Sequence, residues 1–209
     1  MSYGLRIVNQ SGYAQVDENY ANYSLVASGY GTTGAVVMAG MDLADCLVFI
    51  RVPVNVWATT DGGIDSGDRF VVAAKYGSSN FTFEYRIYKY VLALPVTTGY
   101  TLQVYRADGS LCFDGNRAQT RIASVSNYLV GSGATITIPS SGFNPWVLVN
   151  NMDFVKVAMV NASMSNWYTL GFRVSASFDI DVGEVLMKTL PFGLSVPVTN
   201  GNSTILIAR

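Results

Sequence analysis

The chain of 209 residues contains no histidine. Histidine is the commonest general base, and Ser-His-Asp and Cys-His catalysis both depend on it, so its absence excludes these mechanisms. The two cysteines cannot by themselves complete a tetrahedral zinc site. Glutamate is also scarce, since it occurs only three times. We therefore expect a protein that is not an enzyme, that carries no cofactor, and that has no catalytic, cofactor-binding or metal-binding residues.

Charged residues are scarce as well, at 13% of the chain, against about a quarter in an average globular protein. The 13 Lys and Arg residues and the 14 Asp and Glu residues are scattered and form no basic stripe, so we expect no nucleic-acid partner. The surface has to be covered mainly by Ser, Thr, Asn, Gly and Tyr, which are cheaper to remove from water than charged groups. This composition favours burial against other subunits and predicts a homo-oligomer or a subunit docked on other proteins.

Cysteines and long apolar runs are too few for a disulfide framework or a membrane span. Cys46 and Cys112 both lie among apolar neighbours, and we expect buried free thiols. The longest mostly apolar segment, residues 35–54, carries three charged residues, so no membrane span is predicted. The first residues, MSYGLRIV, lack a basic region followed by an apolar run, and we expect no signal peptide.

What the sequence does contain is a long series of β-strand signals. Runs rich in β-branched and aromatic residues alternate with turn sequences of Gly, Asp, Asn and Ser, and helical periodicity is weak throughout. We predict an all-β fold of two packed β-sandwich-like halves, residues 1–97 and 98–209. The alternative is one larger β-sandwich in which the hairpins of both halves join a single core.

A stretch near the N-terminus recurs in the middle of the chain. GLRIVNQSGYAQVDENYANYSLVAS, which begins at Gly4, and TLQVYRADGSLCFDGNRAQTRIASV, which begins at Thr101, align without gaps at an offset of 97 positions. Each copy has alternating apolar residues followed by Ser-Gly or Asp-Gly, which predicts a β-hairpin. A weaker similarity relates residues 81–90 to residues 168–177. Together the two similarities predict an internal duplication. The identical pairs in the first are Leu5 and Leu102, Gly12 and Gly109, Asp17 and Asp114, Asn19 and Asn116, and Ala21 and Ala118.

Three segments carry residue types that occur in binding sites. Residues 29–34, GYGTTG, fit the G-x-G-x-x-G pattern, but no helix pattern follows, so we interpret them as a flexible glycine-rich loop. Carboxylates also cluster in the loop 61–68, and whether it binds a metal stays open, because Asp-Gly pairs commonly form turns. A third segment, FDIDV, places two carboxylates on one strand face, where such pairs are more often solvated than catalytic. The carboxylates are those of Asp61, Asp65 and Asp68 in the loop, and of Asp179 and Asp181 in FDIDV.

The repeated hairpin sequence resembles a known family. YGLRIVNQSGYAQVDENYANYSLVASG resembles the start of small tail-associated proteins of tailed bacteriophages, which often open with a Gly-Leu-x-Ile/Val-x-Asn/Asp-x-x-Gly signature. TLQVYRADGSLCFDGN resembles a variant of the same hairpin, and the similarity covers roughly residues 3–28 and 100–125. The resemblance implies a structural subunit of the virion in the tail tip, baseplate or fibres. It implies synthesis in the host bacterial cytoplasm, assembly with other tail proteins, and no catalytic residue.

An alternative function is a carbohydrate-binding or receptor-recognising β-sandwich that contacts a host surface glycan. Trp57, Trp146 and Trp167 could stack on sugar rings, although large aromatic side chains more often pack in β cores.

Assembly through a sheet edge is the mode that we expect, because few lysines are available to protect edge strands from pairing. The C-terminal segment STILIA, residues Ser203–Ala208, carries no charge. Unless a hairpin partner or a neighbouring strand covers it, this segment is open to backbone pairing. A stable contact should bury more than about 1,000 Å² in total.

Overall fold

The computed structural model describes residues 6–8, 14–17, 23–64, 68–90, 102–105, 108–109, 111–114, 122–129, 135–139, 142–150, 155–161, 164–191 and 202–208. These residues form strands, turns and extended segments and contain no helix, which confirms the predicted all-β fold. Accordingly, the described residues include no helix of the length and apolarity that crossing a membrane requires.

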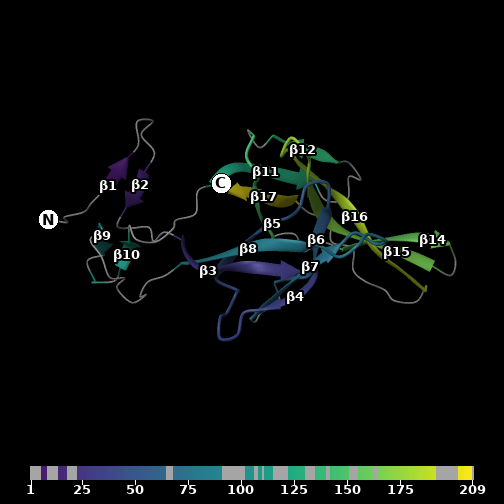
Figure 1. Cartoon of the computed structure of the whole chain (residues 1–209), viewed down its shortest axis with the longest axis horizontal. Coiled ribbons are helices and arrows are strands. Elements are labelled where there is room, and N and C mark those ends of the chain that lie inside the picture. Colours follow the sequence, from purple (N-terminus) through teal and green to yellow (C-terminus); the bar gives the residue numbers. More distant parts are fainter. Residues whose placement is uncertain are drawn as a thin grey trace.

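Each copy of the repeated sequence forms a small β-hairpin, as predicted. β1 (Arg6–Val8) pairs with β2 (Ala14–Asp17), and β9 (Gln103–Tyr105) pairs with β10 (Leu111–Asp114). The offset of 97 positions maps the first hairpin onto the second strand by strand and also maps each residue pair of the register. Even the β-bulge recurs, since the register shifts at the same place in both copies. Figure 1 draws both hairpins at the same end of the molecule, beyond the large sheets.

The first large sheet has six antiparallel strands in the order β11-β17-β13-β5-β8-β3. Its strands are β3 (Tyr23–Thr32), β5 (Cys46–Arg51), β8 (Thr82–Tyr90), β11 (Ile122–Leu129), β13 (Trp146–Leu148) and β17 (Asn202–Ala208). β17 contains the STILIA segment and pairs with β11 on one side and β13 on the other. β11 therefore covers one side of this uncharged segment along its length, and β13 covers the other side at Ile207 and Ala208, so β17 is not an edge strand of the sheet.

The second large sheet has seven antiparallel strands, of which six follow the order β12-β16-β15-β6-β7-β4 and β14 pairs with β15. Its strands are β4 (Gly34–Val37), β6 (Trp57–Ile64), β7 (Arg69–Ala74), β12 (Ile136–Ile138), β14 (Val155–Asn161), β15 (Met164–Val174) and β16 (Ile180–Pro191). β15 and β16 form the most extended pair in the molecule, running from Met164 opposite Pro191 to Val174 opposite Ile180. The turn between them is short.

Both sheets are assembled from the two sequence halves in the same way. The N-terminal half contributes β5-β8-β3 to one sheet and β6-β7-β4 to the other, and the C-terminal half contributes β13-β17-β11 and β15-β16-β12. The halves meet where β5 pairs with β13 and where β6 pairs with β15. We call these two strand pairs the seams. Each seam joins strands that occupy equivalent places in their halves and run antiparallel, which is the relation that a local two-fold axis produces. The predicted boundary at residues 97/98 lies outside the described residues and stays a prediction.

One main core lies between the sheets and receives side chains from both halves. Val48 and Val147 enter it from the six-stranded sheet, and Ala58 and Phe172 enter it from the seven-stranded sheet. Of the two expected arrangements, the structure is nearer to the single larger sandwich, because both large sheets and the core are shared by the two halves. The hairpins β1-β2 and β9-β10 form separate two-stranded sheets and do not extend the large ones, which differs from that expectation. Phe70 of β7 also packs against aromatic rings of β8, with centroid distances of 6.3 Å to Phe83 and 5.7 Å to Tyr85. These edge-to-face contacts tie the layers together.

Residues 29–34 are not the flexible loop that the sequence predicted, because β3 continues to Thr32 and β4 begins at Gly34. A Cβ added at Gly29 would lie 2.7 Å from the Tyr85 hydroxyl, and one added at Gly31 would lie 2.6 Å from the Phe83 ring. Glycine is needed here so that two aromatic side chains of β8 can lie against the backbone of β3. Gly34, with a φ of 128°, then turns the chain from the edge of one sheet to the edge of the other.

The prediction that residues 81–90 and 168–177 are equivalent segments of a duplication was wrong. The first segment contains β8 of the six-stranded sheet, whereas the second contains the end of β15 of the seven-stranded sheet. By position in the sheets, the counterpart of β8 is β17, and the counterpart of β15 is β6. The similarity reflects the alternation that any half-buried strand shows.

Gly171 provides a test of the seam between β6 and β15. It pairs with Thr59 of β6, and an added Cβ would lie 2.5 Å from Val185 and 2.9 Å from the Ala58 backbone oxygen. The Gly171→Ala variant should lower the free energy of unfolding by about 1–3 kcal/mol, because the seam backbone cannot easily move away. Urea denaturation followed by tryptophan fluorescence measures this loss.

The matched control is Gly183→Ala, at the residue that faces Gly171 on β16. There the nearest atom is the side-chain hydroxyl of the exposed Thr135, at 2.9 Å, and a side-chain rotation can relieve the contact. We expect a clearly smaller loss. Equal losses in the two variants would contradict a tight backbone approach at the seam.

Candidate functional site

A row of four side chains crosses the outer face of the six-stranded sheet, which is the face turned away from the main core. The row comprises Tyr30 of β3, Glu84 of β8, Arg51 of β5 and Trp146 of β13, and we call it the six-sheet ladder. Tyr30 is directly opposite Glu84, and Glu84 is directly opposite Arg51. Arg51 Nη2 lies 3.3 Å from Glu84 Oε2, and the Arg51 guanidinium lies 4.2 Å from the centre of the Trp146 ring. The ladder thus crosses the seam between β5 and β13.

Trp146 is held in place by apolar and cationic neighbours together. It is only 5% exposed and belongs to a second buried cluster with Phe49, Tyr88 and Leu148. The guanidinium of Arg86 also lies over its ring, at 4.3 Å. A cation over an indole face contributes roughly 0.5–2 kcal/mol, more as the pair is desolvated. Trp146 is therefore anchored within the protein, and it does not offer the free ring face that a sugar platform needs.

A cleft of about 190 Å³ opens beside this ladder. Val52 and Phe83, which are both buried, are among the residues that line it, together with Arg51, Glu84 and Asn144. Tyr30 also lines the cleft and is 76% exposed, the largest exposed fraction among the described large apolar side chains. The cleft combines an apolar wall, an ion pair and an accessible aromatic ring.

Two polar atoms of the cleft residues lack hydrogen bonds. Nε of Arg51 and Oδ1 of Asn144 are buried, and neither has a partner among the described residues. A buried donor or acceptor without a partner costs about 1–3 kcal/mol. Two residues that line the cleft therefore carry a buried donor and a buried acceptor without a partner in the described part of the chain.

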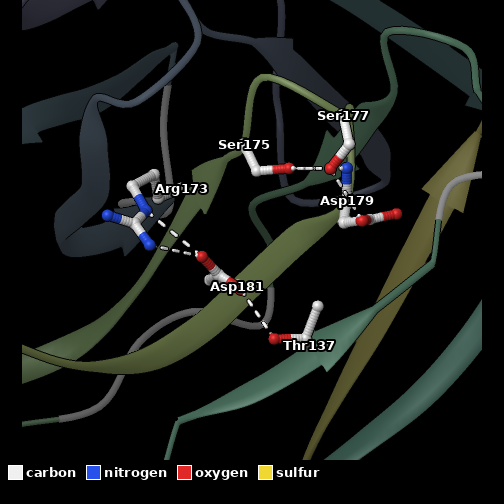
Figure 2. Close-up of polar contacts among 6 residues, drawn as sticks. All are labelled: Thr137, Arg173, Ser175, Ser177, Asp179 and Asp181. Atoms are coloured by element: carbon white, nitrogen blue, oxygen red, sulfur yellow. Dashed lines mark hydrogen bonds and ion pairs between the residues drawn. The ribbon is translucent and has the colours of Figure 1, made fainter.

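A second row crosses the outer face of the seven-stranded sheet and spans the other seam. It comprises Trp57 of β6, Arg173 of β15, Asp181 of β16 and Thr137 of β12, and we call it the seven-sheet ladder. Arg173 donates to Asp181 Oδ2 through Nη2 at 2.6 Å and Nε at 3.2 Å, and Thr137 donates to Asp181 Oδ1 at 2.7 Å. The Arg173 guanidinium lies 5.4 Å from the centre of the Trp57 ring. Figure 2 shows the Asp181 carboxylate between its two donors.

The environment of Asp181 sets its charge. Burial raises the pKa of its carboxyl, but the hydrogen bonds from Arg173 and Thr137 and the positive charge of Arg173 outweigh burial. The net effect is a pKa below the ordinary value of 3.8. Asp181 is therefore ionised at neutral pH, and both of its oxygens are occupied within the protein.

Asp179 and Asp181 do not form the catalytic pair that FDIDV could have provided. Asp179 precedes β16 in the turn, where it accepts a hydrogen bond from Ser177 Oγ at 2.9 Å, and its backbone N–H donates to Ser175 Oγ at 3.0 Å. The hydroxyls of Ser175 and Ser177 lie 2.8 Å apart. Figure 2 shows this serine–aspartate network in the turn, apart from the Asp181 carboxylate. The network satisfies turn polar groups, as short polar side chains commonly do.

The remaining predicted sites divide by how far the structure describes them. The GYGTTG segment leads into β4 and not into a helix, so it lacks the helix N-terminus that would hold a pyrophosphate. Among the described residues, no group of three or more Asp, Glu or Cys residues could hold a metal ion. Asp65 lies outside the described residues, so the metal question for its loop stays open.

The tryptophans and cysteines are described only in part. Trp57 is partly buried, and the side chains of Trp167 and Cys112 lie outside the described part. Cys46 is a buried free thiol, as expected, and its Sγ lies 3.3 Å from the Asp42 carbonyl oxygen. Burial raises the pKa of the Cys46 thiol, which keeps it protonated and unreactive at neutral pH.

No protein-family model, no curated protein and no solved structure matches the chain. The resemblance of its hairpins to phage tail-associated proteins accordingly stays a prediction.

Sequence reasoning missed both ladders and the cleft. The available signal was the alternation in β5, where Leu47, Phe49 and Arg51 share one face and Val48 and Ile50 share the other. An arginine at the end of an apolar strand face predicts a contact between its guanidinium and a neighbouring carboxylate or aromatic ring. The strands that supply these neighbours could not be identified, because alternation specifies a face and not a partner.

The seven-sheet ladder predicts a pH-dependent stability difference. Asp181→Asn should lower the free energy of unfolding by about 1–2 kcal/mol at pH 7, since it removes a partly exposed ion pair with two hydrogen bonds. Because the folded pKa of Asp181 is depressed, its contribution is complete above the unfolded pKa and is lost as the pH falls through the folded pKa. The two proteins should differ equally between about pH 5 and 7 and converge below about pH 4.

Urea denaturation at a series of pH values measures this difference. Asp45→Asn, at an exposed carboxylate, is the control and should change stability by less than about 0.5 kcal/mol. A gap between Asp181→Asn and the unmodified protein that widened at low pH would contradict the assignment.

Proposed function

We propose that the chain is a non-enzymatic structural subunit that assembles through the edges of its two sheets. One observation carries the proposal. The segment 23–37, YSLVASGYGTTGAVV, contains no charged residue and no proline, and it forms both β3 and β4. These strands end the order of the six-stranded and the seven-stranded sheet, respectively, and no other described strand pairs with their outer sides. Soluble monomers usually protect such edges with lysine, proline or a bulge. Of these devices, the segment 23–37 has only the register shift between Leu25 and Ala27 in β3, and the strand from Ala27 to Thr32 and all of β4 have none.

The exposed side chains of these edges support the same proposal. Tyr30 on β3 is 76% exposed and Val37 on β4 is 61% exposed. Because neither edge carries a charge, a partner strand would lose little hydration energy on pairing. A second copy of this chain is the partner that we propose, since the chain already joins two equivalent halves by antiparallel strand pairing at its seams. An extended edge contact of this kind fits an interface above about 1,000 Å².

A place in the virion of a tailed phage is the second step of the proposal. It is supported by the resemblance of the hairpin sequences and by the identical registers of the two hairpins, which mark the hairpin as a repeated unit. The partners would then be other tail proteins at the tail tip, baseplate or fibres. Mass spectrometry of purified particles should detect the chain, and electron microscopy should locate it in the tail. Its absence from particles would refute this step and leave the edge-pairing step standing.

Edge pairing predicts the effect of two added charges. Ser28→Lys on β3 combined with Val37→Lys on β4 places a lysine on each edge at an exposed position. If copies pair through these edges, the double variant should raise the dissociation constant of the oligomer at least about tenfold, since each buried lysine must be desolvated. Light scattering over a concentration series measures the oligomer population.

The matched control is Ser78→Lys combined with Val54→Lys. These residues are also exposed, and the change in charge is the same, but both lie in turns outside the strands. The control should assemble like the unmodified protein. The proposal fails if the unmodified chain is monomeric at all concentrations and in the presence of its particle, or if both double variants assemble normally.

A further inference from the structure

We propose that the cleft beside Tyr30 binds one neutral pyranose ring of a glycan. The proposal does not depend on assembly through the sheet edges. It rests on the placement of four side chains around the cleft, on the chemistry that they offer together, and on the size of the space.

The size of the cleft restricts the ligand to one small ring. Its volume of about 190 Å³ is below the roughly 300–1,000 Å³ of pockets that enclose drug-sized molecules. A dinucleotide or an extended peptide would project far beyond it. A single six-membered ring is closer to this size, and one of the residues that line the cleft, Tyr30, is largely exposed, so the neighbouring units of a glycan could continue into solvent.

The polar groups of the cleft favour a ligand that both donates and accepts hydrogen bonds. Glu84 is half of an ion pair with Arg51, with 37% of its side chain exposed, and it offers acceptor capacity beyond that pair. Arg51 supplies guanidinium N–H donors and Asn144 an amide group to the lining of the cleft, and Arg51 Nε and Asn144 Oδ1 are buried atoms that have no partner among the described residues. Neighbouring hydroxyl groups on a sugar ring supply donors and acceptors side by side, so they match this mixed set.

Charged ligands fit the same groups less well. The Glu84 carboxylate repels an anion, and the guanidinium groups of Arg51 and Arg86, which both lie over Trp146, repel a cation. A neutral polyol meets neither penalty. The ion pair and the Trp146 contact also hold Arg51 in place before a ligand arrives, which lowers the entropy cost of binding.

The aromatic wall supplies the apolar part of the recognition. One face of a pyranose consists largely of C–H groups and packs against an aromatic ring as other apolar surfaces do. Tyr30 provides such a ring, and no strand covers its exposed face among the described residues. The sequence suggested that a tryptophan would stack on a sugar ring, and we propose Tyr30 for this role instead.

The experiment is a chemical-shift titration of the isotope-labelled chain with four probes. These are the methyl glycosides of glucose, galactose, mannose and N-acetylglucosamine, each up to about 50 mM. We expect a dissociation constant on the order of 1 mM for a contact of this size, so this concentration range should reach saturation. At least one probe should shift the backbone amides of residues 30–33, 51–52 and 82–84 with saturation in that range. Failure of all four probes, or shifts confined to other regions, would overturn the proposal.

Variants identify the residues responsible. Tyr30→Ala and Glu84→Gln should each weaken binding of the best probe at least about fivefold, and Tyr30→Phe should bind nearly as well as the unmodified chain. Tyr76→Ala, at a tyrosine that is 59% exposed in the turn between β7 and β8, should leave binding unchanged. Unchanged affinity in both Tyr30→Ala and Glu84→Gln would refute the site.

Two further readouts keep the outcome interpretable. Sodium sulfate is titrated in parallel, and shifts at the same amides with sulfate but with no glycoside would replace the sugar site with an anion site. Thermal unfolding of each variant shows whether it is folded, and Glu84→Gln preserves the side-chain shape if Tyr30→Ala proves unstable. The oligomer population is measured at the same time, so failure of sugar binding with intact assembly separates this proposal from the assembly proposal.

Discussion

The fold depends on two antiparallel strand pairs, β5 with β13 and β6 with β15, that join residues far apart in the sequence. Without them, the N-terminal half would have three strands in each layer, and β5 and β6 would become edges. Side chains such as Val48 and Ala58, which are completely buried in the main core, would then lie at a solvent-exposed edge of the sheet. Loss of this burial would forfeit about 25 cal/mol for each Å² of apolar surface returned to water. The seams therefore complete a core that neither half can close alone.

Each seam is reinforced on its outer face by a tryptophan from one half and an arginine from the other. Trp146 and Arg51 cross one seam, and Trp57 and Arg173 cross the other. In both, a carboxylate on the next strand fixes the guanidinium, so the cation remains paired while it covers an aromatic ring. The two ladders lie in different sheets, and duplication alone would not place them there. Both ladders have the same effect, because in each a tryptophan and a paired arginine cover the outer side of a seam without adding an exposed apolar patch.

Local features of the fold could be predicted from the sequence, whereas long-range ones could not. The hairpins followed from Gly12 and Gly109 in turn sequences flanked by alternating apolar residues, and the structure reproduces them at the predicted offset. The loop predicted at residues 29–34 was wrong, because glycine serves turns and crowded strands alike, and only the positions of Phe83 and Tyr85 distinguish the two. The cleft was missed for the same reason as the seams. Its residues come from β3, β5, β8 and the segment before β13, and no local pattern states that these segments meet.

The two ladders differ at the end that lies away from the seam, and this difference separates a structural role from a binding role. Asp181 accepts from Arg173 through one oxygen and from Thr137 through the other, so the seven-sheet ladder is closed by its own side chains. Glu84 has only Arg51 as a partner among the described residues, and the next residue in its row is Tyr30, an exposed ring beside a cleft. A carboxylate held by one cation, with acceptor capacity left over, is prepared for a second donor. The described residues thus saturate the carboxylate of one ladder and leave acceptor capacity on the carboxylate of the other, which is why we propose a ligand only for the six-sheet ladder. The strand that carries Tyr30 also ends the order of the six-stranded sheet, where we propose that assembly occurs.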